Sequence, residues 1–205
     1  MEKHVKTRNV PLLVDVSERL LLCLLIAPWL VAFASALPQN PGLITSVASE
    51  LLVVVFILIR RPGRIALTPY AFAVGFLGTA LPLCVRPIPG AHVIPASQAL
   101  MLCGLALSIS SKLALNRRFG IVAANRGVQT RGPYALVRHP MYAGYVITQV
   151  GFLISNPTFW NFSVYGCGFV FQLLRISEEE KLLKQDEAYM AFAERVRYRL
   201  VPGLF

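Results

Sequence analysis

Hydrophobic residues in this chain are gathered into long runs, and most charged residues are crowded into the short stretches between them. A helix that crosses a membrane needs about 20 apolar residues, with a range of roughly 17–25. Four runs of this length lie before the polar connector that begins at residue 116, and they cover residues 20–37, 43–59, 65–85 and 95–115. The pattern therefore predicts four membrane-spanning helices in the N-terminal part.

Two more apolar runs follow the connector, at residues 142–155 and 158–174, with Asn156-Pro157 between them. Proline disfavours helix at the residue before it, so this dipeptide predicts a turn between two helices. The charged remainder, residues 175–205, is predicted to be helical until Pro202-Gly203. The predicted fold class is all-α, a polytopic transmembrane helix bundle with about five to six membrane segments.

Two parts of the chain differ in character: residues 1–115 form a unit of membrane helices, and residues 116–205 combine a polar connector, a helical hairpin and a tail. Within the helices, Ala71-xxx-Gly75 and Gly104-xxx-Ser108 place small residues one turn apart. Such pairs allow membrane helices to approach closely. They mark candidate helix contacts without assigning their partners.

The positions of the basic residues predict an orientation in the membrane. Nineteen of the twenty Lys and Arg residues lie before the first run, after the second, in the stretch 112–141 or in the tail, and Arg86 alone lies in an alternate loop. Loops rich in Lys and Arg stay in the cytoplasm. We therefore expect an even number of crossings with both termini cytoplasmic, in the inner membrane if the cell is bacterial.

Composition agrees with a membrane protein. The chain is 56% hydrophobic, against about 45–50% for soluble domains, and its mean hydropathy is +0.60. The net charge of +10 is typical of proteins that meet nucleic acid or anionic lipid. Because the basic residues flank the apolar runs, the lipid explanation is favoured and a nucleic-acid partner is not expected. Oligomeric state has no signature in the sequence.

Cysteines and acidic residues within the apolar runs are few. Cys23, Cys84, Cys103 and Cys167 lie far apart without a CxxC or Cys/His spacing, so neither a metal site nor a disulfide framework is predicted. Glu50 lies near the middle of a predicted span, where carboxylates are costly and often functional. Since no basic residue is expected at that depth, we interpret Glu50 as protonated or hydrogen-bonded within the bundle.

Side chains capable of chemistry concentrate in residues 125–142 and 175–199. His139 precedes Pro140 and should lie outside a helix, while Pro140 suits the first helical turn. The free N–H groups at that helix start are expected to face the cytoplasmic side, where they would hold a carboxylate or phosphate. The alternative is an interfacial turn with aromatic and basic anchors.

The segment after the last apolar run is acidic as well as basic. Arg175 and Glu179 share a helix face, and an exposed pair of this kind contributes about 0.3–0.5 kcal/mol. The cluster at residues 178–180 is unusual beside a membrane that attracts basic residues, and would receive a cation such as the amino group of a cofactor. Farther on, an amphipathic helix against the membrane face is predicted by Tyr189, Phe192, Val196 and Leu200.

Taken together, these residues resemble the isoprenylcysteine carboxyl methyltransferases and the related bacterial phospholipid methyltransferases, from about residue 126 to the end. The interval between the glutamates and Tyr189 is shorter than in many relatives, and Phe192 stands where many have Tyr. The resemblance rests on Gly132-x-Tyr134, Arg138-His139-Pro140-x-Tyr142-x-Gly144, Asn156-Pro157, Arg175-x-x-x-Glu179-Glu180, Tyr189-x-x-Phe192, Arg195-Val196 and Pro202.

The resemblance implies an integral membrane methyltransferase that uses S-adenosylmethionine, without a metal, in a pocket on the cytoplasmic side of residues 116–205. The acceptor would be lipophilic, either a prenylcysteine-type carboxylate or a lipid head group. Arg175 and His139 would be catalytic. The cofactor would contact Arg126, Gly127, Val128, Gln129, Tyr134, His139, Pro140, Met141, Tyr142, Glu179 and Glu180.

The acceptor determines what the site must do. A carboxylate needs no base, and Arg175 would orient it, whereas an amine or phenol must lose a proton to His139 or a glutamate. Two alternatives to a methyltransferase stay open. A membrane sterol-type reductase using NADPH has a similar C-terminal pattern but a longer chain and a more extended aromatic motif around the His. A non-enzymatic membrane scaffold leaves the clustered polar residues unexplained.

Overall fold

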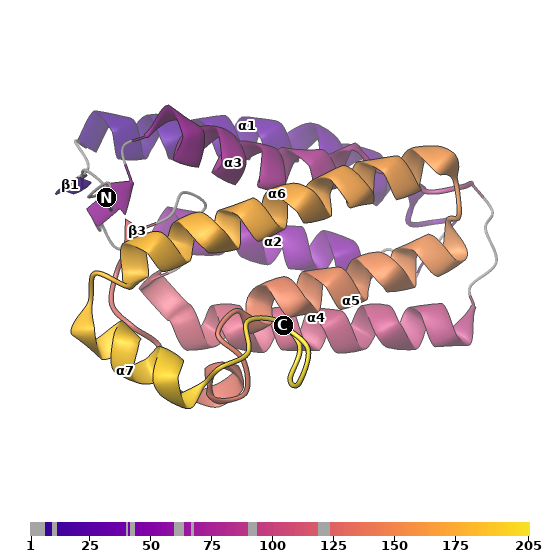
Figure 1. Cartoon of the computed structure of the whole chain (residues 1–205). Coiled ribbons are helices and arrows are strands. Elements are labelled where there is room, and N and C mark those ends of the chain that lie inside the picture. Colours follow the sequence, from indigo (N-terminus) through magenta and orange to yellow (C-terminus); the bar gives the residue numbers. More distant parts are fainter. Residues whose placement is uncertain are drawn as a thin grey trace.

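Helices α1–α6 run lengthwise in one bundle, and α7 lies at one of its ends (Figure 1). The computed structural model describes residues 7–9, 12–39, 41, 44–59, 64–66, 68–89, 94–118 and 124–205. The helices are α1 (Leu12–Ala36), α2 (Ile44–Ile59), α3 (Pro69–Ala80), α4 (Pro95–Leu115), α5 (Pro140–Ser155), α6 (Phe159–Leu183) and α7 (Glu187–Arg195). The helical class of the fold is therefore confirmed.

Most helix positions follow the apolar runs, and α4 has the predicted bounds. The third run is α3 followed by a short 3-10 helix, Leu81–Cys84. The prediction of a helical tail up to Pro202 is wrong, because α6 ends at Leu183 and α7 ends at Arg195. The break arises at Asp186, whose carboxylate accepts the N–H of Ala188 at 3.0 Å and so starts a new helix.

The closest helix pair is α4 and α5, and glycines permit it. A Cβ at Gly144 would lie 2.6 Å from the carbonyl oxygen of Gly104 and 2.7 Å from the backbone nitrogen of Ser108. A Cβ at Gly104 would lie 2.5 Å from the backbone nitrogen of Thr148. The predicted Gly104-xxx-Ser108 pair is thus the surface that receives α5, while buried Ala71 and Gly75 belong to α3, which packs on α6.

A small antiparallel sheet at one end of the bundle joins segments that are distant in sequence. Its strands are β1 (Thr7–Asn9), β2 (Arg64–Ala66) and β3 (Ala124–Asn125), in the order β1-β2-β3. They come from three of the segments whose basic residues predict a common side, and α7 lies at the same end (Figure 1). Strands this short carry no alternating apolar pattern, so the sequence did not predict them.

The opposite end carries the α5–α6 turn. There Asn161 accepts the backbone N–H of Arg86 at 2.9 Å, and Asn156 accepts that of Ile88 at 2.8 Å. The isolated basic residue of the alternate loops thus lies away from the sheet, in agreement with the predicted division of charge. Which end faces the cytoplasm stays a prediction.

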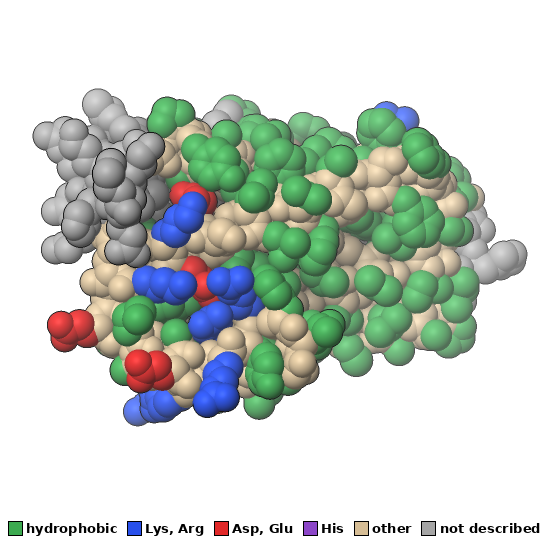
Figure 2. Space-filling model, viewed as in Figure 1, with side chains coloured by type: hydrophobic (Ala, Val, Ile, Leu, Met, Phe, Trp, Pro, Cys, Tyr) green, Lys and Arg blue, Asp and Glu red, His purple; other side chains and the backbone are tan. Residues whose placement is uncertain are grey.

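The face of the bundle that Figure 2 shows is largely apolar. Hydrophobic side chains cover the helices along their length, and charged ones gather near α7 (Figure 2). Among the described residues, one helix, Pro95–Leu115, is long and apolar enough for a complete membrane span, and the apolar stretches Cys23–Ala36, Glu50–Ile59 and Pro69–Cys84 are shorter. The number of about five to six membrane segments therefore stays a prediction.

Candidate functional site

The connector after α4 reaches the site through turns that depend on glycine. Gly127 has a φ of 98° and Gly132 a φ of 65°, a region that side chains with a Cβ rarely adopt. Asn125 shapes the first turn by accepting the N–H of Gly127 at 2.9 Å, and its amide donates to Asp186 at 3.0 Å. This contact ties the connector to the start of α7. The predicted turn at Gly132 is the 3-10 helix Gly132–Ala135.

The start of α5 is held by the C-terminal tail. The backbone N–H groups of Arg138 and His139 donate to the carbonyls of Tyr198 and Arg199 at 2.9 and 2.8 Å. His139 lies outside the helix and Pro140 begins it, as predicted. Pro140 has no N–H, and those of Tyr142 and Ala143 donate to the carbonyl of His139, so these three positions offer none to an anion. The anion site at this helix start stays a prediction.

Glu179 is the centre of the first polar cluster. Its Oε1 accepts the hydroxyl of Tyr142 at 2.5 Å and Nε of Arg175 at 3.3 Å. Nδ1 of His139 lies 3.8 Å from Oε2. The guanidinium of Arg175 also covers the ring of Tyr142, 5.2 Å from its centroid. The side chain keeps 19% exposure, so this carboxylate is held on one side and open on the other.

Glu180 is enclosed by donors. Its carboxylate lies 2.8 Å from Nη2 of Arg199, 3.1 Å from Nη2 of Arg138 and 3.3 Å from Nε2 of His139, and the hydroxyl of Tyr189 donates at 3.4 Å. The side chain is 2% exposed. Burial alone would raise the pKa of Glu180, but the hydrogen bonds from His139 and Arg199 and the neighbouring positive charges lower it to about 2. This carboxylate ties the tail to the start of α5.

His139 joins these two clusters. Its two ring nitrogens face Glu179 and Glu180, at 3.8 and 3.3 Å. Both nitrogens are therefore engaged with carboxylates, an arrangement that suits a residue fixing the glutamates in place. These contacts do not test whether His139 takes a proton from the acceptor, and that role stays a prediction.

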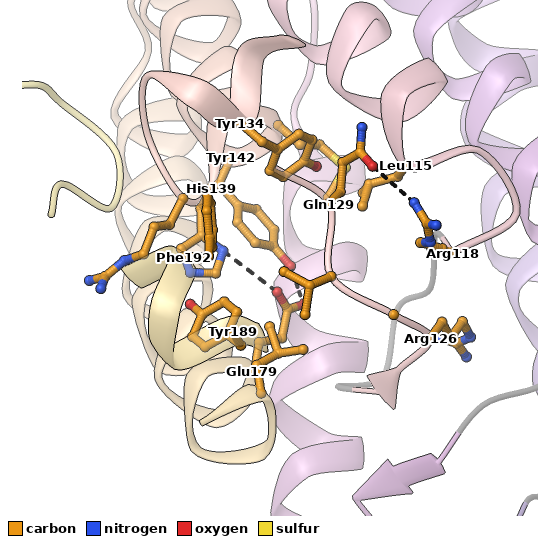
Figure 3. A pocket seen from close by; sticks show the side chains of 15 residues that line it. Leu115, Arg118, Arg126, Gln129, Tyr134, His139, Tyr142, Glu179, Tyr189 and Phe192 are labelled. Atoms are coloured by element: carbon orange, nitrogen blue, oxygen red, sulfur yellow. Dashed lines mark hydrogen bonds and ion pairs between the residues drawn. The ribbon is translucent and has the colours of Figure 1, made fainter. Parts of the chain in front are cut away.

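A pocket opens beside Glu179, between the connector, α5, α6 and α7 (Figure 3). Aromatic rings, one carboxylate and several guanidinium groups line it. Nine of the predicted cofactor residues are brought together there: Arg126, Gly127, Val128, Gln129, Tyr134, His139, Met141, Tyr142 and Glu179. Pro140 instead lines an apolar groove on the other side of its helix turn, and Glu180 is directed into the ion network described above.

The structure adds lining residues that the sequence interpretation missed. Arg118, at the end of α4, donates to the side-chain oxygen of Gln129 at 2.9 Å. Tyr189 and Phe192 were predicted to face the membrane, and this is wrong, because both are buried and pack with Tyr134 in the pocket wall. Their spacing of three residues showed a common face but could not show which way that face turns. The other added residues are Leu115, Arg138 and Leu183.

A second pocket lies inside the bundle, with a volume of about 890 Å³ that includes its open mouth. Its walls come from α1, α2, α3, α5 and α6 and the 3-10 helix after α3. Arg175, predicted to face the substrate, lines this pocket and not the first. Tyr142 lines both, so the two pockets adjoin at its ring.

Glu50 is on the wall of this second pocket. The expectation that no basic residue lies at its depth is wrong. Lys112 of α4 is fully buried, its Nζ lies 4.9 Å from the ring centroid of Tyr145, and its charge acts on Glu50. The acidic side chain of Glu50 on α2 and the amine of Lys112 on α4 therefore lie within electrostatic range of each other.

Comparison with known proteins agrees with this geometry. Residues 93–189 match the family model of the phospholipid methyltransferases. No curated protein and no solved structure matches the chain. The matched segment holds α4, α5 and α6 and reaches into α7, and so contains most residues that line the first pocket. The match confirms the resemblance to the phospholipid methyltransferases that was predicted from the sequence.

Proposed function

We propose that this chain, in which residues 93–189 match the phospholipid methyltransferase family, is an integral membrane methyltransferase that uses S-adenosylmethionine to methylate a lipophilic acceptor. One observation carries the proposal: the contact of Tyr142, Arg175 and Glu179 separates two pockets that adjoin there. Glu179 faces the first pocket and Arg175 the second. Two reactants bound on either side would meet at this contact.

The residues of the first pocket fit the cofactor. S-adenosylmethionine carries two positive groups, a carboxylate and an adenosine. Glu179 offers a partly exposed carboxylate for the amino group, and the rings of Tyr134, Tyr189 and Phe192 offer apolar faces for a base. The segment 126–129 would line the adenosine, as the resemblance implies. When bound, the cofactor supplies an electrophilic methyl group on a sulfonium.

The chain's own task in such a reaction is positioning. Holding two reactants in a near-attack geometry supplies about 7–11 kcal/mol of the barrier reduction. Tyr142 and Arg175 keep Glu179 in one orientation from two sides. The apolar side chains around the second pocket would exclude water and admit a lipid, while the soluble cofactor would enter from the end that carries the sheet and α7, which we place in the cytoplasm.

Calorimetry on the protein purified in detergent tests the cofactor assignment. We expect saturable binding of S-adenosylmethionine and none of NADPH, the cofactor of the alternative reductase. Glu179→Gln should weaken binding at least about tenfold, because a charge-assisted contact of roughly 1.5–3 kcal/mol is lost. Glu178→Gln is the matched control, since Glu178 pairs with Lys181 at 2.6 Å and lines neither pocket. Binding of NADPH alone, or full binding by the Glu179 variant, would overturn the assignment.

Methyl transfer is tested separately with labelled cofactor and a membrane lipid extract. Arg175→Ala should abolish incorporation of label because Arg175 lines the second pocket. The protein should stay folded and still bind the cofactor measurably, though more weakly, since the contact with Glu179 is lost. Normal turnover by this variant would contradict the division of the site into a cofactor side and an acceptor side.

A further inference from the structure

Aromatic rings form much of the wall of the second pocket. Trp29 and Phe33 of α1 stack with their ring centroids 3.9 Å apart, and Tyr142 and Tyr145 of α5 meet edge to face at 6.1 Å. Tyr165 of α6 lines the same space. These rings also present faces and edges to the pocket, against which a further flat aromatic ring can pack. The walls thus suit a ring better than a flexible aliphatic head group.

Two buried polar atoms in this wall have no hydrogen-bond partner in the described part of the chain. They are Oε1 of Gln172, an acceptor, and Nε1 of Trp29, a donor. Both side chains line the pocket, with exposures of 4% and 8%. Buried polar groups in native proteins are nearly always paired, so an unpaired one in a pocket wall indicates a polar ligand atom. A hydroxyl group can pair with either atom, since it donates and accepts.

The charges around the pocket discriminate between head groups. The aromatic faces that would hold an ammonium already carry cations: Arg175 over Tyr142 at 5.2 Å, and Lys112 over Tyr145 at 4.9 Å. An entering amine would meet these positive charges. An entering carboxylate has no proton to donate to the unpaired oxygen of Gln172. A neutral hydroxyl on an aromatic ring avoids both conflicts.

The acceptor atom would lie next to the contact between the pockets. Gln172, Arg175 and Glu179 are spaced by three and four residues on α6, so they follow one another along one helix face. This face begins in the second pocket and ends in the first. A hydroxyl held by Gln172 is therefore close to the place where the methyl donor would be bound.

We propose that the second pocket binds a lipid with a phenolic head group, whose oxygen is the methyl acceptor; this inference rests on the proposed function. The phenolic oxygen forms a bond to the methyl carbon as the carbon–sulfur bond of the sulfonium donor breaks, and the electron pair of that bond stays on sulfur. The phenolic proton passes to the carboxylate of Glu50. In the bound lipid the hydroxyl donates to Gln172; its one proton turns to Glu50 as the transfer begins, and Arg175 and Lys112 favour the developing phenolate.

Binding can be measured without the cofactor, because Trp29 is itself a reporter. The chain has two tryptophans, and Trp160 lies at the far end of the bundle, where Arg86 covers its ring. Trp160→Phe therefore leaves Trp29 as the sole tryptophan. The variant in detergent is titrated with dodecylphenol, dodecylamine and dodecanoic acid, which differ only in the head group. We expect a saturable change in Trp29 fluorescence with the phenol at concentrations at least about tenfold lower than with the others.

A pair of glutamine variants shows whether the binding occurs in this pocket. Gln172→Met keeps the size of the side chain and removes the acceptor, and should weaken phenol binding about tenfold, the effect of one lost hydrogen bond. Gln185→Met is the control, since Gln185 is exposed beyond the end of α6. Tighter binding of the amine or the acid, equal binding of all three, or no effect of Gln172→Met would each overturn the phenol assignment.

Transfer of labelled methyl to the same three lipids completes the test, with cofactor binding measured by calorimetry on each sample. We expect label on the phenol, and a kcat lowered by roughly 10²–10⁴ in Glu50→Gln with phenol binding retained, as for loss of a general base. Cofactor binding without transfer to the phenol, or unchanged kcat in Glu50→Gln, overturns this inference alone. Absence of cofactor binding overturns the proposed function itself. A saturable change in Trp29 fluorescence with the phenol would then still show that the second pocket binds a phenolic lipid.

Discussion

Glu179 and Glu180 are neighbours on α6 whose carboxylates have different surroundings, and the same substitution should therefore affect them differently. Glutamine replaces either side chain with little change in size and removes its charge. Glu180 lies among Arg138, His139 and Arg199 with 2% exposure, whereas Glu179 is 19% exposed and faces the first pocket. We expect Glu180→Gln to affect stability and Glu179→Gln to affect cofactor binding.

The magnitude for Glu180 follows from its pKa. Folding lowers this pKa from 4.5 to about 2, and each unit is worth 1.36 kcal/mol, so at neutral pH the charged form contributes on the order of 3 kcal/mol. Removing one partner from a buried ion pair costs about 3–5 kcal/mol, which agrees. For a chain of this size the loss lowers the melting temperature by roughly 6–12 °C.

The effect of Glu179→Gln on stability should be smaller, about 1 kcal/mol, because a glutamine oxygen still accepts from Tyr142 and Arg175. Thermal unfolding in one detergent, followed by intrinsic fluorescence, measures the stability of both variants. Calorimetry with S-adenosylmethionine on the same preparations measures cofactor binding by both variants. The reasoning would be refuted by a Glu180→Gln protein with the melting temperature of the wild type. It would also be refuted if Glu179→Gln were the less stable of the two variants, because the buried ion pairs of Glu180 would then not stabilise the fold.

Three further predictions concern acid, helix packing and the link between the pockets. Because the pKa of Glu180 is lowered, its contribution to stability is present above pH 4.5 and lost as the pH falls towards 2; melting temperatures in an acid series should fall over this range, and less so in Glu180→Gln. Gly144→Val should destabilise the protein by about 1–3 kcal/mol or more, because its Cβ would meet a backbone oxygen at 2.6 Å, whereas Gly166→Val has nothing within 4 Å and should stay monodisperse in gel filtration; equal behaviour of the two would contradict the packing. Tyr142→Phe should keep the ring under Arg175 and lose the hydrogen bond to Glu179, lowering methyl transfer about tenfold or more; an unchanged rate would deny Tyr142 a positioning role.

The sequence was sufficient for the helices and for the set of site residues that lie close together along the chain. Long apolar runs become helices in lipid because every backbone polar group must be paired internally, and α4 accordingly has its predicted bounds. Asn156-Pro157 separates α5 from α6, and Pro140 begins α5, since proline acts on its immediate neighbours. The segment 126–129 enters the pocket as the resemblance implied.

Tertiary structure decided what each of these residues faces. Glu179 and Glu180 are alike in sequence, yet one lines a pocket and the other is enclosed by Arg138 and Arg199, because the C-terminal tail returns to the start of α5. The inward turn of α7 and the second pocket likewise depend on packing between distant segments. A sequence pattern reports neighbours within a turn or two, whereas a pocket is formed by surfaces that meet only when the whole bundle packs. This is the physical reason why most residues of the first pocket were recognisable from the sequence and the second pocket was not.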